Sequence, residues 1–183
     1  MKTLASFLVL PALLLLGSSL RADDKPRVSP HEKVTATVDG NEMILVYGRP
    51  YTKDPKSGAP RKIWGDLVPF GKVWRMGADE ATLLTTDKEI EMGGKKIAPG
   101  TYSLFLLPEE NGGAKLIVNK QTGQWGTKYD EGQDLARIEM KKGANPKSVD
   151  QFTITIEKND GSGGELKLSW EDTSYSVLFS VTK

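Results

Sequence analysis

The segment Phe152-Thr153-Ile154-Thr155-Ile156-Glu157-Lys158 decides the fold class of this 183-residue chain. Large apolar residues alternate with polar ones along it, which is typical of a strand with one face buried and the other in water. The same alternation returns in Glu165–Trp170 and Tyr175–Thr182, where Leu178 is the exception on the polar face. The glycine-rich segment 159–164 between them is typical of a turn. The C-terminal part is therefore predicted to be an antiparallel sheet that serves as scaffold.

Upstream of this segment, period-two alternation also dominates. Apolar and threonine residues alternate over 34–38, and Asp39-Gly40 is a hairpin signal. Further strands are predicted at Met43–Tyr47, Ala81–Thr86, Glu89–Met92, Thr101–Leu107, Lys115–Asn119 and Ala136–Lys141. Short helical turns are expected only near Ile63–Val68 and Lys147–Gln151. Residues 33–183 are thus predicted to form one all-β domain, an antiparallel β-sandwich or a jelly-roll-like barrel with few short helical turns.

The first 22 residues have the features of a signal peptide. Lys2 precedes the apolar run Leu4–Leu16, and Ala22 stands before an acidic pair. Cleavage is expected after Ala22, with Ser19 as the alternative, which leaves residues 23–32 as an N-terminal arm. An uncleaved anchor is the competing interpretation, although an apolar run of about 13 residues is short for a bilayer core. The protein is predicted to be exported to the periplasm or secreted, with no membrane span after cleavage.

Composition excludes several classes of protein. The net charge of +1 becomes −1 once Lys2 and Arg21 leave with the signal peptide, and such a balance does not suit a nucleic-acid-binding protein. The chain contains no cysteine, so stability must come from the core and not from disulfides. Its length is sufficient for such a core. No glycine-rich phosphate loop is present, and no cofactor is predicted.

Metal and triad chemistry have little support. With His31 as the only histidine and no cysteine, the usual zinc and copper sites are not available. A Ser-His-Asp triad would need His31, and no Gly-x-Ser-x-Gly sequence accompanies it. The acidic segments 130–134 and 159–161 resemble calcium loops only loosely and are interpreted as ordinary turns. No metal site is predicted.

Residues 47–82 are the most informative part for function. Aromatic rings, arginines, acids and glycines are concentrated there with little periodic pattern, which is typical of irregular loops that build binding and catalytic sites. Arginine can grip a carboxylate, and an exposed indole can stack on a sugar ring. The predicted ligand-binding residues are Arg49, Trp64, Trp74, Arg75, Glu80 and Tyr102.

Two structural interpretations compete with this site. Arg49 or Arg75 could instead tie the long loop to the sheet through a network with carboxylates. Trp64 and Trp74 could fill the core, which is the commoner place for tryptophan, and Trp170 is expected to be core. For catalysis the candidates are Glu80, Asp79 and Arg75, with a carboxylate as base and the arginine as electrostatic stabiliser.

The same motifs carry a family resemblance. They are Ser29-Pro30, Tyr47-Gly48-Arg49-Pro50, Ile63-Trp64-Gly65, Val68-Pro69, Gly71-Lys72-Val73-Trp74-Arg75, Gly77-Ala78, Glu80-Ala81-Thr82, Pro99-Gly100-Thr101-Tyr102-Ser103-Leu104-Phe105, Asn119-Lys120 and Trp125-Gly126. From about Ser29 to the C-terminus the chain resembles DUF2911, a bacterial exported family of unknown function. The resemblance implies a compact, mostly β domain but no activity. The family often has asparagine where this chain has Asp79, and the added charge either alters a ligand contact or pairs with an arginine.

Three functions remain open at this stage. The first is an exported domain that binds a small molecule, such as a glycan fragment or another ligand with a carboxylate, which predicts a shallow groove with exposed rings. The second is a hydrolase or lyase, which requires a deep pocket and a carboxylate with a raised pKa. The third is a structural domain with a protein partner in the cell envelope, which predicts a buried arginine–acid network, no pocket, and a broad apolar patch or free sheet edge.

Overall fold

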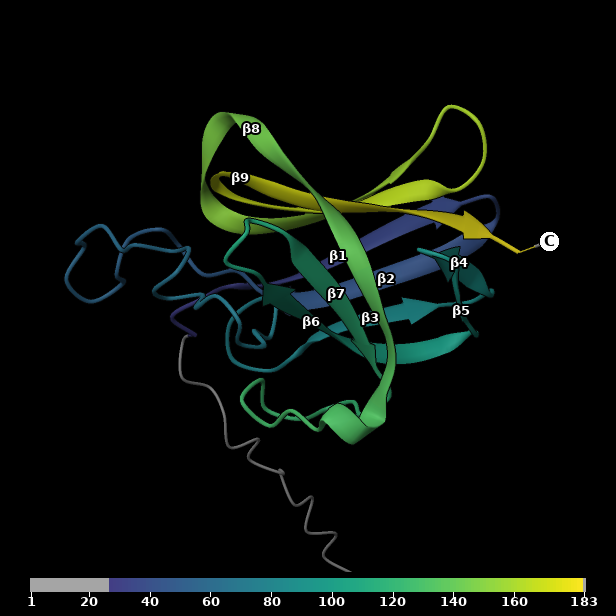
Figure 1. Cartoon of the computed structure of the whole chain (residues 1–183), viewed down its shortest axis with the longest axis horizontal. Helices are drawn as coiled ribbons and strands as arrows, with labels where there is room; N and C mark the ends of the chain where they lie inside the picture. Colours follow the sequence, from purple (N-terminus) through teal and green to yellow (C-terminus); the bar gives the residue numbers. More distant parts are fainter. Residues whose placement is uncertain (1–26, 183) are drawn as a thin grey trace, which may run out of the picture.

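The computed structural model describes residues 27–182, which form one antiparallel sheet of nine strands (Figure 1). The predicted signal peptide and residues 23–26 of the arm lie outside the described residues. The strands are β1 (His31–Val38), β2 (Asn41–Gly48), β3 (Thr82–Thr86), β4 (Ile90–Met92), β5 (Lys95–Ile97), β6 (Gly100–Pro108), β7 (Ala114–Asn119), β8 (Asp134–Lys158) and β9 (Gly164–Val181). No helix in this part of the chain is long and apolar enough to cross a membrane.

The order of strands in the sheet is β1-β2-β3-β6-β7-β8-β9-β4-β5. The small β4–β5 hairpin is inserted between β3 and β6 in the sequence, but it pairs with the end of β9. Strand β8 belongs to both halves of the sheet, because its first residues pair with β7 and the remainder pairs with β9. One backbone strand therefore connects the two halves.

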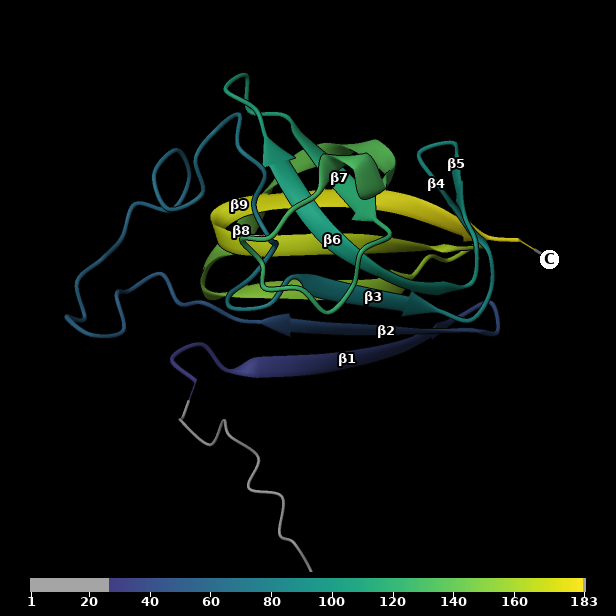
Figure 2. The same ribbon diagram turned by 90° about the horizontal axis from the view of Figure 1, so that it is seen from below.

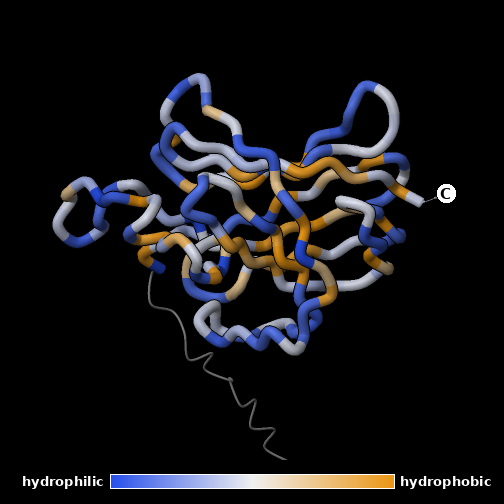
Figure 3. Tube along the Cα trace, in the orientation of Figure 1, coloured by the Kyte–Doolittle hydropathy of each residue, from blue (hydrophilic) through white to orange (hydrophobic). Residues whose placement is uncertain are grey.

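The sheet coils so that two layers face each other. Strands β8 and β9 lie over β1, β2 and β3 when the molecule is seen from below, and β1 contacts β8 (Figure 2). Fully buried residues such as Leu45, Leu84, Phe152 and Leu168 fill the space between the layers. Apolar residues are concentrated in the middle of the molecule, while the projecting loops are hydrophilic (Figure 3). The hydrophobic effect thus holds the layers together.

The predicted all-β, single-domain antiparallel fold is confirmed. The layers are two parts of one continuous sheet, and the jelly-roll-like detail stays a prediction. Leu178 is the exposed exception on its strand, as the alternation indicated. The predicted strands at 136–141 and 152–158 are parts of the single strand β8, and those at 165–170 and 175–182 are joined in β9. The short strand β5 was not predicted.

The two predicted helical turns are wrong. Ile63–Val68 forms a turn in which the Val68 amide donates to the Ile63 carbonyl, with a bridge between Trp64 and Val68. Residues 147–151 lie within β8. The amide of the Asn145 side chain donates to the carbonyl oxygens of Glu171 and Thr173, which keeps this irregular stretch extended beside β9. Among the described residues, a 3-10 helix is found instead at Glu131–Gln133, with Asp130 as its N-cap.

Tyr47 links the two layers through the core. Its ring packs edge-on against Phe152 at 5.9 Å, and its hydroxyl accepts a hydrogen bond of 2.9 Å from the Ile154 amide. The same hydroxyl lies within donating distance of the Ile154 carbonyl and of the Glu32 carboxylate. Burial is the main reason that the pKa of Tyr47 is raised to about 12. Strand β2 is therefore fixed to β8 by a polar contact inside the apolar core.

The connection between β2 and β3, which we call the long loop (residues 49–81), projects from one end of the sheet (Figure 1). Its end returns to the end of β2 by backbone contact, where the Ala78 amide donates to the Gly48 carbonyl at 3.2 Å. A Cβ atom on Gly48 would stand 2.4 Å from the Ala78 carbonyl oxygen, and one on Gly77 would stand 2.7 Å from the Gly48 oxygen. Only glycine allows this close approach, which explains the Tyr-Gly-Arg-Pro and Gly-Ala motifs.

Candidate functional site

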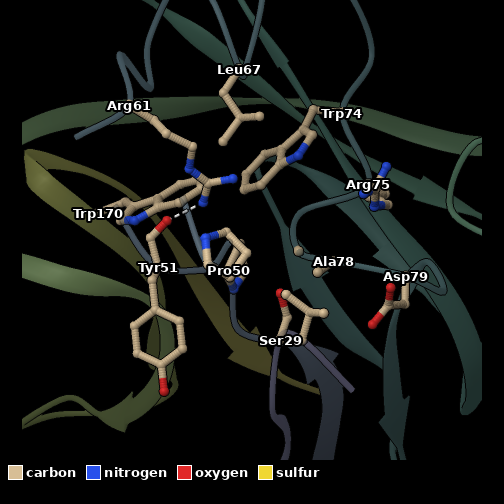
Figure 4. A pocket seen from close by; sticks show the side chains of 13 residues that line it. Ser29, Pro50, Tyr51, Arg61, Leu67, Trp74, Arg75, Ala78, Asp79 and Trp170 are labelled. Carbon is tan, nitrogen blue, oxygen red and sulfur yellow. Dashed lines mark hydrogen bonds between the residues drawn. The ribbon is translucent and has the colours of Figure 1, made fainter. Parts of the chain in front are cut away.

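The long loop encloses a cavity of about 290 Å³ against β9 and the N-terminal segment (Figure 4). The loop supplies most of the wall, β9 supplies Trp170, and residues 28 and 29 close one side. The lining residues are Val28, Ser29, Pro50, Tyr51, Pro55, Arg61, Leu67, Trp74, Arg75, Gly77, Ala78, Asp79 and Trp170. Apolar walls with a few charged groups are typical of a small-molecule site.

Two stacked indoles form the inner wall of the cavity. The rings of Trp74 and Trp170 are nearly parallel, with centroids 5.7 Å apart, and Phe152 packs edge-on against both. The backbone of Trp74 exchanges two hydrogen bonds of 2.7 Å with Leu106 of β6. The loop is thus anchored to the sheet immediately before Arg75, so the backbone of Arg75 is held in a fixed position.

Arg75 is a half-buried cation without a hydrogen-bond partner in the part of the chain that the structure describes. Within residues 27–182 its guanidinium makes no hydrogen bond and no salt bridge, and its Nε atom is buried. Burial lowers the pKa of Arg75, and the nearby Asp79 carboxylate partly opposes this effect. Leaving a buried charged donor unpaired costs free energy, so such groups are uncommon in folded proteins unless a ligand completes them.

Arg61 and Trp170, which also line the cavity, each have a buried N–H group without a partner among the described residues. Arg61 donates through Nη2 to the Tyr51 carbonyl, but its Nε atom is buried and finds no acceptor among the described residues. The indole Nε1 of the fully buried Trp170 is likewise without a partner there. Six buried side-chain polar atoms of residues 27–182 have no partner, and three of them belong to residues that line this cavity.

The loop backbone is strained where it presents Asp79. Met76 and Asp79 have positive φ angles of 50° and 65°, a region that non-glycine residues rarely adopt. The Thr82 hydroxyl donates to the Met76 carbonyl at 2.6 Å, and the Gly126 amide donates to the Asp79 carbonyl at 2.9 Å. These bonds hold the strained conformation, which places Asp79 beside Arg75 at the cavity edge (Figure 4).

Glu80 does not line this cavity and belongs to a second, ionic cluster. Arg27 binds both oxygens of the Glu80 carboxylate at 2.6 and 2.9 Å, and the His31 Nε2 atom lies 3.0 Å from it. The hydrogen bonds from Arg27 are the main reason that the pKa of Glu80 is lowered to about 2. Glu80 is therefore a weak base, and it fixes the N-terminal segment beside the cavity wall formed by residues 28 and 29.

His31, Asp79 and Glu80 offer possible metal-ligand atoms within 4.8 Å of one another. The cation of Arg27 already occupies this cluster, since it bonds to Glu80 and lies 3.8 Å from an Asp79 oxygen. A metal ion would have to displace that guanidinium, so the arrangement favours the ion pairs of Arg27 over a metal site.

Arg49 is fully engaged by protein groups. It forms a salt bridge of 2.7 Å with Glu32, donates from Nε to the Phe152 carbonyl, and donates from Nη2 to the Thr153 hydroxyl. It thus connects β1 and β8 with the start of the long loop. This placement agrees with the alternative interpretation, in which Arg49 ties the long loop to the sheet.

The structure brings together only part of the predicted site. Trp74, Arg75 and Asp79 line the cavity, whereas Arg49 and Glu80 lie in the networks described above. Trp64 packs edge-on against Tyr175 at 5.4 Å, and the Tyr102 hydroxyl donates to the Ala98 carbonyl, so neither lines the cavity. The cavity is also lined by Tyr51, Arg61 and Trp170, which were not among the predicted site residues. Arg61 lies within residues 47–82, where a site was expected, but Trp170 gave only the signal of a core strand.

Comparison with protein families identifies the chain. Residues 29–179 match the family described as "Protein of unknown function (DUF2911)". This match spans most of the chain, which therefore belongs to that family, and the resemblance carried by the loop motifs is confirmed. The comparisons with curated proteins and with solved structures gave no match.

Proposed function

We propose that this member of the DUF2911 family is an exported protein, periplasmic or secreted, that binds a small carboxylate-bearing ligand in the cavity between Arg61 and Arg75. The observation that carries the proposal is the half-buried guanidinium of Arg75, which has no hydrogen-bond partner among residues 27–182. A carboxylate-bearing ligand offers several oxygen acceptors and would complete the donors of Arg61 and Arg75.

The contrast between the two central arginines supports this function. Arg49 forms a salt bridge with Glu32 and hydrogen bonds with Phe152 and Thr153, as expected for a residue whose role is to stabilise the fold. Arg75 is likewise half-buried, but it has no such partners within the described residues. A folded protein gains nothing in stability from a desolvated, unpaired charge. Binding is the function that accounts for its position.

Catalysis by Glu80 has less support than binding. A general base near neutral pH needs a raised pKa, whereas Arg27 holds the pKa of Glu80 at about 2. Glu80 also does not line the cavity that contains Arg75. A purely structural function would explain the Arg49 network, but it would leave the unpaired donors around the cavity without a purpose.

The test is isothermal titration and thermal shift of the purified protein against a panel of small carboxylates, neutral sugars, nucleotides and divalent cations. A carboxylate is expected to bind, and Arg75→Ala should weaken it at least about tenfold, which corresponds to about 1.4 kcal/mol. The melting temperature of that variant should stay within a few degrees. The exposed Lys72, which does not line the cavity, gives a matched control in Lys72→Ala.

Two results would overturn the proposal. One is a panel in which no carboxylate binds at any concentration tested. The other is a bound carboxylate whose affinity does not change in Arg75→Ala, because the site would then lie elsewhere.

A further inference from the structure

We infer that the ligand is a hydroxylated monocarboxylate of single-ring size, that is, a sugar acid, with its carboxylate at Arg61 and its hydroxyl groups at Arg75 and Asp79. This inference rests on the proposed function and specifies the ligand of that same cavity.

The charge of the lining favours a monoanion. The charged side chains of the cavity are Arg61, Arg75 and Asp79, which together carry one net positive charge. A single carboxylate neutralises this excess. A dicarboxylate or a phosphate dianion would leave a negative charge in a half-buried site next to Asp79, which is unfavourable at low local dielectric.

The two sides of the cavity differ in hydrogen-bonding chemistry. Arg61, Tyr51 and Trp170 lie on one side of the cavity, and Arg75 and Asp79 lie on the other (Figure 4). The first side carries the Arg61 guanidinium, which can only donate, and has no carboxylate among the lining residues. A carboxylate has only acceptors, so it fits this side.

The second side carries a donor and an acceptor next to each other. Arg75 can only donate, and the Asp79 carboxylate can only accept. The Asp79 side chain is 30% exposed, and its ion pair with Arg27 is long, at 3.8 Å, so its oxygens remain able to accept further hydrogen bonds. A hydroxyl group both donates and accepts, so neighbouring hydroxyls of a sugar satisfy Arg75 and Asp79 together. A simple apolar acid would leave both unsatisfied.

The size of the cavity sets the size of the ligand. Its volume of about 290 Å³ is at the lower end of the range for small-molecule sites. A cavity of this size can enclose a single ring but not an oligosaccharide. Pro50, Leu67 and the indole of Trp74 line the cavity between its two polar sides and give apolar surface for the C–H face of a sugar ring.

The experiment is titration calorimetry of the purified protein with three groups of ring compounds of matched size. They are the sugar acids glucuronate and galacturonate, the neutral sugar glucose, and the acid without hydroxyls, cyclohexanecarboxylate. At least one sugar acid is expected to bind about tenfold or more tightly than both glucose and cyclohexanecarboxylate.

Two variants assign the sides. Arg61→Gln should reduce the affinity for the sugar acid to that for glucose. Asp79→Asn should weaken the sugar acid about tenfold, whereas the affinity for cyclohexanecarboxylate should stay equal or rise, because a negative charge is removed. Circular dichroism at the titration temperature confirms that both variants are folded.

The outcomes separate the two proposals. If cyclohexanecarboxylate binds as tightly as both sugar acids, the sugar-acid inference is overturned and the proposed carboxylate site stands. If Asp79→Asn weakens both kinds of acid equally, the assignment of the hydroxyl side is overturned alone. If no acid binds, both proposals are overturned, and binding of glucose alone would have the same consequence.

Discussion

Arg75 lies directly against the backbone of Gly126, so closely that a Cβ atom on Gly126 would stand 2.0 Å from the Arg75 Cδ atom. The same Cβ would be 2.8 Å from the Asp79 carbonyl oxygen, which already accepts a hydrogen bond from the Gly126 amide. The aliphatic stem of the unpaired arginine is thus positioned by the absence of a side chain in a neighbouring loop. This contact gives a physical reason for the Trp125-Gly126 motif.

Replacing that glycine tests the contact. Gly126→Ala should destabilise the protein by about 1–3 kcal/mol, because both Arg75 and the Asp79 backbone must move. It should also weaken the carboxylate ligand, since Arg75 is displaced. Urea denaturation and calorimetry measure the two effects. Gly161 has no atom within 4 Å of a built Cβ and no positive φ, so Gly161→Ala is the matched control and should change stability by less than about 0.5 kcal/mol. Equal effects of the two variants would contradict the contact.

Arg49 and Arg75 should respond to mutation in opposite ways. Arg49→Ala leaves the Glu32 carboxylate and the Phe152 carbonyl without their donor, and should cost about 2–4 kcal/mol in the free energy of unfolding. Arg75→Ala removes an unpaired, partly desolvated charge and should be neutral or slightly stabilising. Denaturant unfolding of both variants side by side checks this. A loss of more than about 2 kcal/mol in Arg75→Ala would mark Arg75 as structural.

The hydroxyl of Tyr47 should contribute measurably to stability. Tyr47→Phe removes the acceptor of the buried Ile154 amide and should cost about 1–2 kcal/mol. Tyr102→Phe is the comparison, because its hydroxyl makes one hydrogen bond, to the Ala98 carbonyl near the surface, and should lose less than about 0.5 kcal/mol. Hydrogen exchange of the Ile154 amide should accelerate only in Tyr47→Phe, and unchanged protection would refute the role of this bond.

Glu80 should give a pH-dependent contribution to stability. Its pKa is about 2 in the folded protein, below its ordinary value of 4.5, so its stabilising effect is complete above pH 4.5 and is lost as the pH falls toward 2. The side chain is 40% exposed, so solvent screening limits the effect to about 1 kcal/mol. Glu80→Gln should therefore be less stable than the wild type at pH 7, and the difference should shrink as the pH is lowered from 4.5.

Thermal unfolding between pH 7 and pH 2.5 measures this difference. The matched control is Glu42→Gln, which changes an exposed glutamate on β2. A difference between wild type and Glu80→Gln that stays constant over the whole range would show that the ion pair with Arg27 is not responsible.

Local patterns predicted most of the fold because most strands have one buried and one exposed face. Where this alternation is lost, the prediction failed. In β8 the residues from Lys141 to Ser148 are almost all exposed, and they include Gly143 and Pro146, so nothing in the pattern indicates a strand. Their extended shape depends on Asn145 and on pairing with β9, both of which are long-range contacts. For the same reason, the sequence does not show that the predicted short strands join to form the long strands β8 and β9.

The site was only partly predictable because its parts come from three separate regions of the chain. Trp74, Arg75 and Asp79 lie within residues 47–82, whose unusual composition indicated a site. Trp170 alternates like any core residue, and only the folded chain shows that its buried indole also lines a cavity. Sequence could not distinguish the satisfied Arg49 from the unsatisfied Arg75, because that difference depends on neighbours supplied by β1 and β8.

The participation of β8 in both halves of the sheet has a consequence for how the protein folds and opens. Its first residues pair with β7 and the rest with β9, so neither half can separate without breaking hydrogen bonds of the same strand. The domain should therefore act as one cooperative unit, with core amides of both halves exchanging only through global unfolding. Because strands distant in sequence must meet before this strand is complete, folding should be slow for a domain of this size.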